Sequence, residues 1–286
     1  MDIAVRILNG LLMIALPIGL GIFLARRAGQ RRRLFLIGGA LFIGSQLLHI
    51  PFNLVVLNPI LERLGIAEGD LGVGLLTWAL LLGLSAGLFE EIARWLGLRY
   101  WLKDARSWNS ALLYGAGWGG AEAILLGVAV LFFLVQALLY RAGQLPSIIP
   151  PEQLQLVEAQ FEAYWETPLF LNLLGAAERV FALALHVSLS VMVMRAFTHN
   201  NRRWLLAAIV WHTLVNAVAV VAITQVGAVA TEAIVAVMAA ISLAIIYRLK
   251  QHDPLQTVAP VTAPAEFDPF PLEATEEKLE DSRYSR

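Results

Sequence analysis

The sequence has no cysteine among its 286 residues. This absence excludes disulfide bonds, thiolate nucleophiles and zinc sites built from cysteine. Charged residues are also scarce, because they make up 15% of the chain, whereas a soluble domain contains about 25%. With 58% hydrophobic residues, the composition excludes a soluble globular protein.

The charge balance shows no preference for a polyanionic partner. The chain carries 22 acidic and 21 basic residues, a net charge of -1, and its basic residues cluster only beside apolar runs. We therefore expect no nucleic-acid partner. The relevant partner is the lipid bilayer.

The apolar runs predict membrane-spanning helices. Each run is about as long as the roughly 20 residues needed to cross the hydrocarbon core. None has the alternation of a β-barrel strand, so we predict an all-α, polytopic transmembrane bundle of about seven spans. The first run has neither a charged n-region nor an A-x-A cleavage pattern and is expected to be retained. Only 225–227 separate the last two runs, which indicates a tight hairpin or a broken helix. The runs occupy 3–25, 34–60, 70–98, 109–139, 169–196, 204–225 and 228–248.

The positions of Lys and Arg predict the orientation. One set of loops and span ends, at 26–33, 94–106, 195–203 and 248–250, holds fourteen of these residues. We therefore expect an outside N-terminus and a cytoplasmic C-terminus. The transmembrane domain is predicted at 1–250, followed by a disordered, acidic cytoplasmic tail at 251–286. The connection at 140–168 predicts either an amphipathic helix on the outer membrane surface or a solvated loop helix.

Ionisable residues inside the spans are the candidate site, because each costs at least about 2.5 kcal/mol at membrane depth. In LFEEIAR, Glu90 and Arg94 are four residues apart, so an ion pair between them is expected. Glu91 points about 100° away and is expected to have no such partner in its own helix, which makes it the better candidate for a base. The glycines before Glu122, in YGAGWGGAEA, predict a helix-packing seam.

The fifth and sixth predicted spans add imidazoles. His186 lies in AAERVFALALHVSLS, while His212 and Asn216 are four apart in WHTLVNAV. Each histidine alone could be a hydrogen-bonded core residue, and Asn216 could simply bond between helices. Depth favours a shared site, because Glu91, Glu122 and both histidines lie eight to thirteen residues from cytoplasmic landmarks, or about 12–20 Å.

Two hydrolytic schemes fit this set. Two histidines and one carboxylate match a catalytic zinc site with an open position for water. Alternatively, a Glu and a His activate water directly, while Asn216 and Arg94 or Arg179 stabilise the oxyanion. The motifs G-x-S-x-G and H-E-x-x-H are absent, which disfavours a serine hydrolase and a zincin.

Five motifs in this order resemble a known family. They are SQLLHIPFN, with Gln46, His49 and Asn53, then EEIAR, GAGWGGAEA, ERVFALALHVSLS and HTLVN. Together they resemble the YhfC family of intramembrane metalloproteases, which is similar to the PrsW and CAAX-prenyl-protease/bacteriocin-processing (CPBP, Abi) families. The resemblance covers about 40–220 and implies an intramembrane peptidase of the bacterial cytoplasmic membrane, which cuts a membrane-embedded or membrane-proximal peptide. We expect catalytic roles for Glu90, Glu91, Arg94 and Asn216, and metal binding, with zinc, by Glu122, His186 and His212.

Two departures from the family pattern matter. The spacing E-E-x-x-R is nearer to the PrsW form, so prenylated substrates do not follow. Trp118 stands where the resemblance leads us to expect a histidine. If that histidine is catalytic, this chain is inactive; if it only lines the cavity, activity survives. One alternative is therefore a catalytically inactive membrane scaffold. Another is a proton-coupled transporter, since intramembrane Glu and His also form proton relays.

Overall fold

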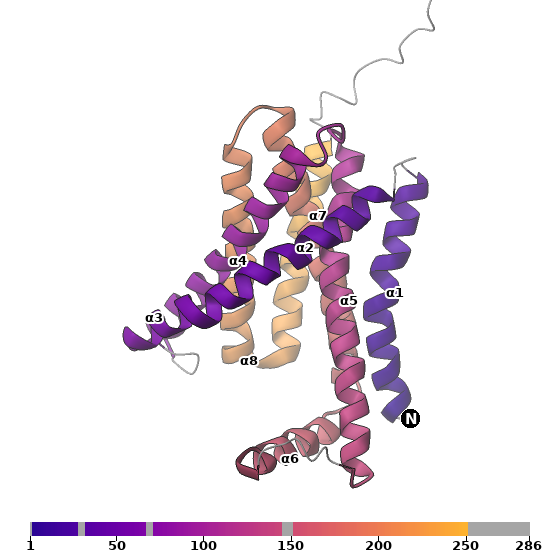
Figure 1. Ribbon diagram of the computed structural model, residues 1–286, viewed down its shortest axis with the longest axis vertical. Coiled ribbons are helices and arrows are strands. Elements are labelled where there is room, and N and C mark those ends of the chain that lie inside the picture. Colours follow the sequence, from indigo (N-terminus) through magenta and orange to yellow (C-terminus); the bar gives the residue numbers. More distant parts are fainter. Residues whose placement is uncertain (1, 28–31, 67–70, 145–150, 251–286) are drawn as a thin grey trace, which may run out of the picture. The chain divides into compact units, whose positions relative to one another are not determined.

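The computed structural model describes residues 2–27, 32–66, 71–144 and 151–250, and every element in these ranges is a helix. The predicted all-α bundle is thereby confirmed (Figure 1). The tail predicted at 251–286 lies outside the described residues. The α-helices are α1 (Asp2–Arg27), α2 (Arg33–Phe52), α3 (Asn58–Arg63), α4 (Val73–Tyr100), α5 (Trp108–Arg141), α6 (Pro151–Glu166), α7 (Leu174–Thr198) and α8 (Arg203–Lys250). A π-helix, η1 (Asn53–Leu57), joins α2 to α3, and a short 3-10 helix, η2 (Leu171–Leu173), precedes α7.

Among the described residues, six helical stretches are long and apolar enough to cross a membrane, and the last of them reverses direction. Helix α8 is interrupted at Gly227, whose φ of 75° is readily adopted only by glycine. Trp211 Nε1 donates to Ser242 Oγ at 3.1 Å, although a straight helix would separate these residues by about 46 Å. The segments 203–226 and 228–250 are therefore antiparallel arms, which gives the predicted seven spans and settles the predicted turn as a hairpin.

Helix α5 packs against α1, α2 and α7. It approaches α7 closely because it presents glycines there: a Cβ on Gly115 would lie 2.7 Å from the Val187 Cα. A Cβ on Gly119 would lie 3.0 Å from the His186 Cδ2. The predicted packing seam is present, and it brings His186 of α7 beside α5.

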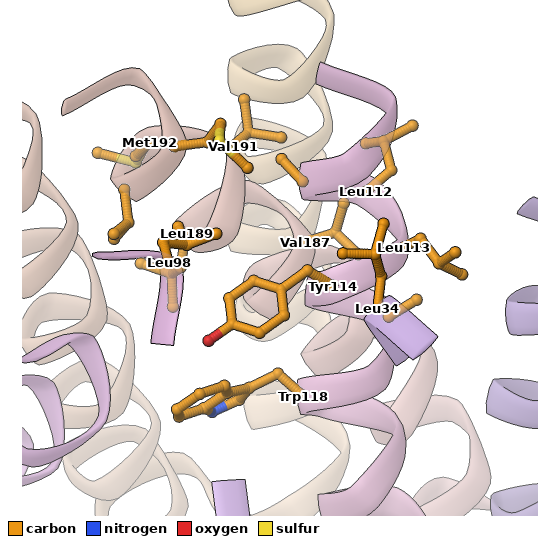
Figure 2. Packing of buried hydrophobic residues seen from close by; sticks show 14 of the residues in the cluster. Leu34, Leu98, Leu112, Leu113, Tyr114, Trp118, Val187, Leu189, Val191 and Met192 are labelled. Atoms are coloured by element: carbon orange, nitrogen blue, oxygen red, sulfur yellow. The ribbon is translucent and has the colours of Figure 1, made fainter. Parts of the chain in front are cut away.

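Apolar side chains of α2, α4, α5 and α7 fill the space next to this seam (Figure 2). Leu98, Leu113 and Leu189 have no exposed surface. Tyr114 and Trp118 lie one turn apart on α5, at the lower edge of this cluster in Figure 2. Large apolar residues such as Leu47, 71% exposed, instead cover the outside, as expected of helices in lipid.

The basic span ends gather at one end of the bundle. Arg33 donates to the Trp101 carbonyl at 3.3 Å, and Arg195 donates to the Leu249 carbonyl at 3.0 Å. Figure 1 shows α6 at the opposite end, together with the N-terminus. The basic span ends that were predicted to lie on one side of the membrane are thus found at the same end of the bundle. We expect this end to face the cytoplasm.

Helix α6, within the connection predicted to be helical, packs on the bundle through aromatic side chains. The rings of Phe161 and Phe133 lie 5.4 Å apart, and the guanidinium of Arg6 stacks 4.0 Å from the ring of Tyr164. The exposed face of α6 carries acidic residues.

Candidate active site

A cavity of about 480 Å³ lies among α2, α4, α5, α7 and both arms of α8. One part of its wall is polar and the rest is apolar, with Phe42, Phe181 and Met238 among the apolar side chains. Five residues predicted for the site line this cavity, whereas Glu91 and Arg94 lie behind its wall with no exposed surface. The polar lining comprises Gln46, His49, Glu90, Glu122, Glu178, Arg179, His186, His212 and Asn216.

The ion pair expected between Glu90 and Arg94 is not formed, and this prediction was wrong. Arg94 Nη1 instead donates to both carboxylate oxygens of Glu91 at 2.6 Å. Residues three apart share a helix face about as well as residues four apart. The face that carries Glu91 and Arg94 is turned into the protein, and there the two charges neutralise each other. Glu91 was also expected to lack a partner in its own helix, which is equally incorrect.

Glu91 orients His212. The carboxylate of Glu91 accepts from His212 Nδ1 at 2.9 Å, so the second imidazole nitrogen, Nε2, is left as an acceptor in the neutral ring. His212 is 2% exposed and lines the cavity. A carboxylate that fixes the tautomer of a histidine is the arrangement found in catalytic triads.

His186 links Arg94 to Glu122. Arg94 Nη2 lies 3.2 Å from His186 Nδ1; since a guanidinium only donates, Nδ1 accepts and Nε2 carries the proton. His186 Nε2 then donates to Glu122 Oε2 at 2.6 Å. The other oxygen of Glu122 accepts from Arg179, which also donates to Glu178. The rings of His186 and His212 are 5.7 Å apart.

Glu90 is the carboxylate of α4 that reaches the cavity. Gln46 Nε2 donates to its Oε1 at 3.0 Å, and Trp118 Nε1 donates to its Oε2 at 2.9 Å. Both donors are neutral, so no cation compensates the charge of Glu90 through these two bonds. Trp118 has no exposed surface and does not line the cavity. The indole therefore supports Glu90 from behind, and Trp118 does not replace a group inside the cavity.

Asn216 lies one turn after His212 on α8 and also lines the cavity. Its carboxamide has no side-chain hydrogen bond to any described residue. The amide is thus available to donate to an oxygen atom brought into the cavity.

Gln46 and His49 belong to the polar wall, although they were not among the predicted site residues. His49 bonds with Gln46, Ser85 and Asn53. The signal that could have found them is their spacing, because positions 46, 49 and 53 fall on one face of a helix. Two amides and an imidazole on one face of an apolar helix are costly in lipid unless they are paired.

The donor atoms do not form a metal cage in this arrangement. In the described part of the chain, no group of three or more His, Asp or Glu side chains lies close enough to hold a metal ion. Both nitrogens of His186 already have partners, and Arg179 occupies an oxygen of Glu122. A divalent ion here would also lie close to two guanidinium groups, which repel it. The predicted zinc ligands therefore do not fit a metal as they are placed.

Comparison with known proteins gives one family. A family model described as YhfC intramembrane metalloprotease matches residues 12–239. A Bacillus subtilis (strain 168) protein with the name "Uncharacterized membrane protein YhfC" is 32% identical over 217 residues, which are 74% of this chain and 82% of that protein. No solved structure matches the chain. The family's name implies a metal, and the donor geometry described above disagrees with that implication.

Proposed function

Since this chain belongs to the YhfC intramembrane metalloprotease family, we propose that it is a peptidase of the bacterial cytoplasmic membrane that uses Glu90 to activate water. The observation that carries this proposal is the placement of Glu90. It is held by two neutral donors at the wall of a cavity that also contains His212 and Asn216.

The chemistry follows from these groups. A water molecule in the cavity gives one proton to Glu90, while the free Nε2 of His212 accepts the other hydrogen as a hydrogen bond. The water oxygen attacks the peptide carbonyl, and the amide of Asn216 donates to the oxyanion that develops. Glu90 then passes its proton to the leaving amine. Glu91 and Arg94 keep His212 in the tautomer that this step needs.

The shape of the cavity favours a membrane-embedded substrate. Ile50, Leu125 and Leu126 line the cavity and are 52%, 49% and 41% exposed. The cavity therefore reaches the surface of the bundle between α2 and α5. Figure 1 shows α2 crossing α5 obliquely and diverging from it toward α3. We propose that an apolar substrate segment enters the cavity from lipid beside Ile50, Leu125 and Leu126.

The test uses purified protein in proteoliposomes and a library of tagged single-span peptides, with products identified by mass spectrometry. Wild-type protein is expected to cut a subset of these peptides, and Glu90→Gln is expected to cut none. Glu62→Gln, on an exposed position of α3, is the matched control and should cut at the wild-type rate. Equal cleavage by Glu90→Gln would refute the proposal, and pH-dependent flux without cleavage would favour a transporter.

A further inference from the structure

A continuous line of hydrogen bonds runs from Glu90 into α2. Gln46 Nε2 donates to Glu90 Oε1 at 3.0 Å, and Gln46 Oε1 lies 3.3 Å from His49 Nδ1. Beyond His49, its Nε2 lies 3.0 Å from both Asn53 Nδ2 and Ser85 Oγ. Ser85 Oγ also lies 2.9 Å from Asn53 Oδ1.

When Glu90 is ionised, the bonds from Glu90 through Gln46 and His49 to Asn53 fit one direction. The hydroxyl of Ser85 has a single hydrogen, which goes to His49 Nε2, to Asn53 Oδ1 or to the Leu82 carbonyl. Asn53 Nδ2 can only donate, so His49 Nε2 accepts and the ring proton lies on Nδ1. His49 Nδ1 then donates to Gln46 Oε1, which turns the amino group of Gln46 toward Glu90. In the reverse direction, the carbonyl oxygen of Gln46 would face a carboxylate oxygen, and two acceptors would repel each other.

The ring of His49 has little freedom to leave this position. It stacks on Phe89, with the ring centroids 5.4 Å apart and the planes inclined by 28°, and the residue is 9% exposed. The π-helix η1 begins at Asn53, directly after α2. Such insertions are rare and are often found at functional sites.

We propose that His49 and Gln46 are positioning residues for Glu90. His49, held as the Nδ1–H tautomer, orients the carboxamide of Gln46, and that carboxamide holds the carboxylate of Glu90 at the cavity wall. This inference rests on the proposed function of Glu90, and it assigns a role to a histidine that neither donates to nor accepts from Glu90 itself.

The kinetic test compares Gln46→Met, His49→Phe and the double variant in the cleavage assay. Each single change is expected to lower kcat about 10- to 100-fold with little change in KM, because Glu90 loses its alignment. Since His49 acts through Gln46, the double variant should be no slower than Gln46→Met alone. Gln225→Met, at an exposed site in the α8 turn, is the matched control. Losses that multiply in the double variant would overturn the proposal.

A second readout does not depend on cleavage. Nitrogen NMR of histidine-labelled protein in lipid, with His49→Phe used to assign the signal, should show neutral His49 protonated on Nδ1. Gln46→Met should reduce that preference. Protonation on Nε2 in the wild-type protein overturns the proposal even if Glu90→Gln abolishes cleavage. If no peptide is cut by wild type, the peptidase assignment fails, whereas the tautomer still reports on whether the line of hydrogen bonds exists.

Discussion

The indole of Trp118 on α5 donates to Glu90 Oε2 of α4 at 2.9 Å. The same ring carries the guanidinium of Arg94 on its face, 4.3 Å from the centroid. One side chain thus supports two charged groups that are close in sequence but serve different parts of the site. Trp118 stands where the family resemblance predicts a histidine. A neutral histidine could offer a similar N–H donor, so this departure does not by itself indicate an inactive protein.

We expect Trp118→Phe to lower cleavage about tenfold or more, because it removes the donor to Glu90 while keeping an aromatic ring for packing. Trp118→His should restore part of the rate, since it returns a donor. Both variants are measured with a peptide that the wild-type protein cuts. Wild-type activity in Trp118→Phe would mean that the bond to Glu90 has no catalytic role.

Arg94→Met is expected to destabilise the protein by about 3–5 kcal/mol, because it leaves the carboxylate of Glu91 buried without a counter-charge. The measurement is unfolding in detergent by circular dichroism. The double change Glu91→Gln and Arg94→Met should recover much of this loss, since it removes both charges. If the double variant is as unstable as Arg94→Met, the ion pair does not explain the stability.

A substitution in the glycine seam between α5 and α7 is expected to affect cleavage more strongly than stability. A Cβ on Gly119 would approach His186 to 3.0–3.1 Å, so Gly119→Ala should displace that ring and weaken its bond to Glu122. We expect a loss of cleavage that exceeds the loss of stability. Gly19→Ala is the matched control, because a Cβ there meets nothing within 4 Å. Equal activity in the two variants would show that the position of His186 is unimportant.

The arrangement of donors predicts that cleavage does not require a bound metal. Purified wild-type protein should contain far less than one zinc ion per chain, and its cleavage rate should persist after treatment with a strong chelator and desalting. One zinc per chain that is lost in His212→Ala, together with chelator-sensitive cleavage, would restore the metal site expected from the sequence and from the family's name.

The spans and the shared depth of the site could be predicted from sequence because they depend on local properties. Run length fixes the helices, and the distance of His186 or His212 from a helix end fixes its depth. The partners of Glu90 and Glu91 could not be predicted, because positions three and four residues away are both within reach of Arg94. Which of the two carboxylates enters the cavity depends on the rotation of α4 about its axis, and contacts with α2, α5 and α8 set that rotation.

Gln46 and His49 illustrate the same difficulty. Their spacing places them on one face of α2, yet only the oblique crossing of α2 shows that this face meets Glu90. The hairpin in α8 was visible as two alternatives in the sequence. A glycine at its centre permits the reversal, and the contact between Trp211 and Ser242 shows that the reversal occurs.

The most direct test of the role of Glu90 is a single-turnover cleavage in water labelled with oxygen-18. If Glu90 acts as a base on water, the label appears in the new carboxyl group of the cut peptide and is absent from the Glu90 side chain. Label recovered in the Glu90 carboxylate would contradict this account, because it would show that Glu90 attacks the peptide bond itself.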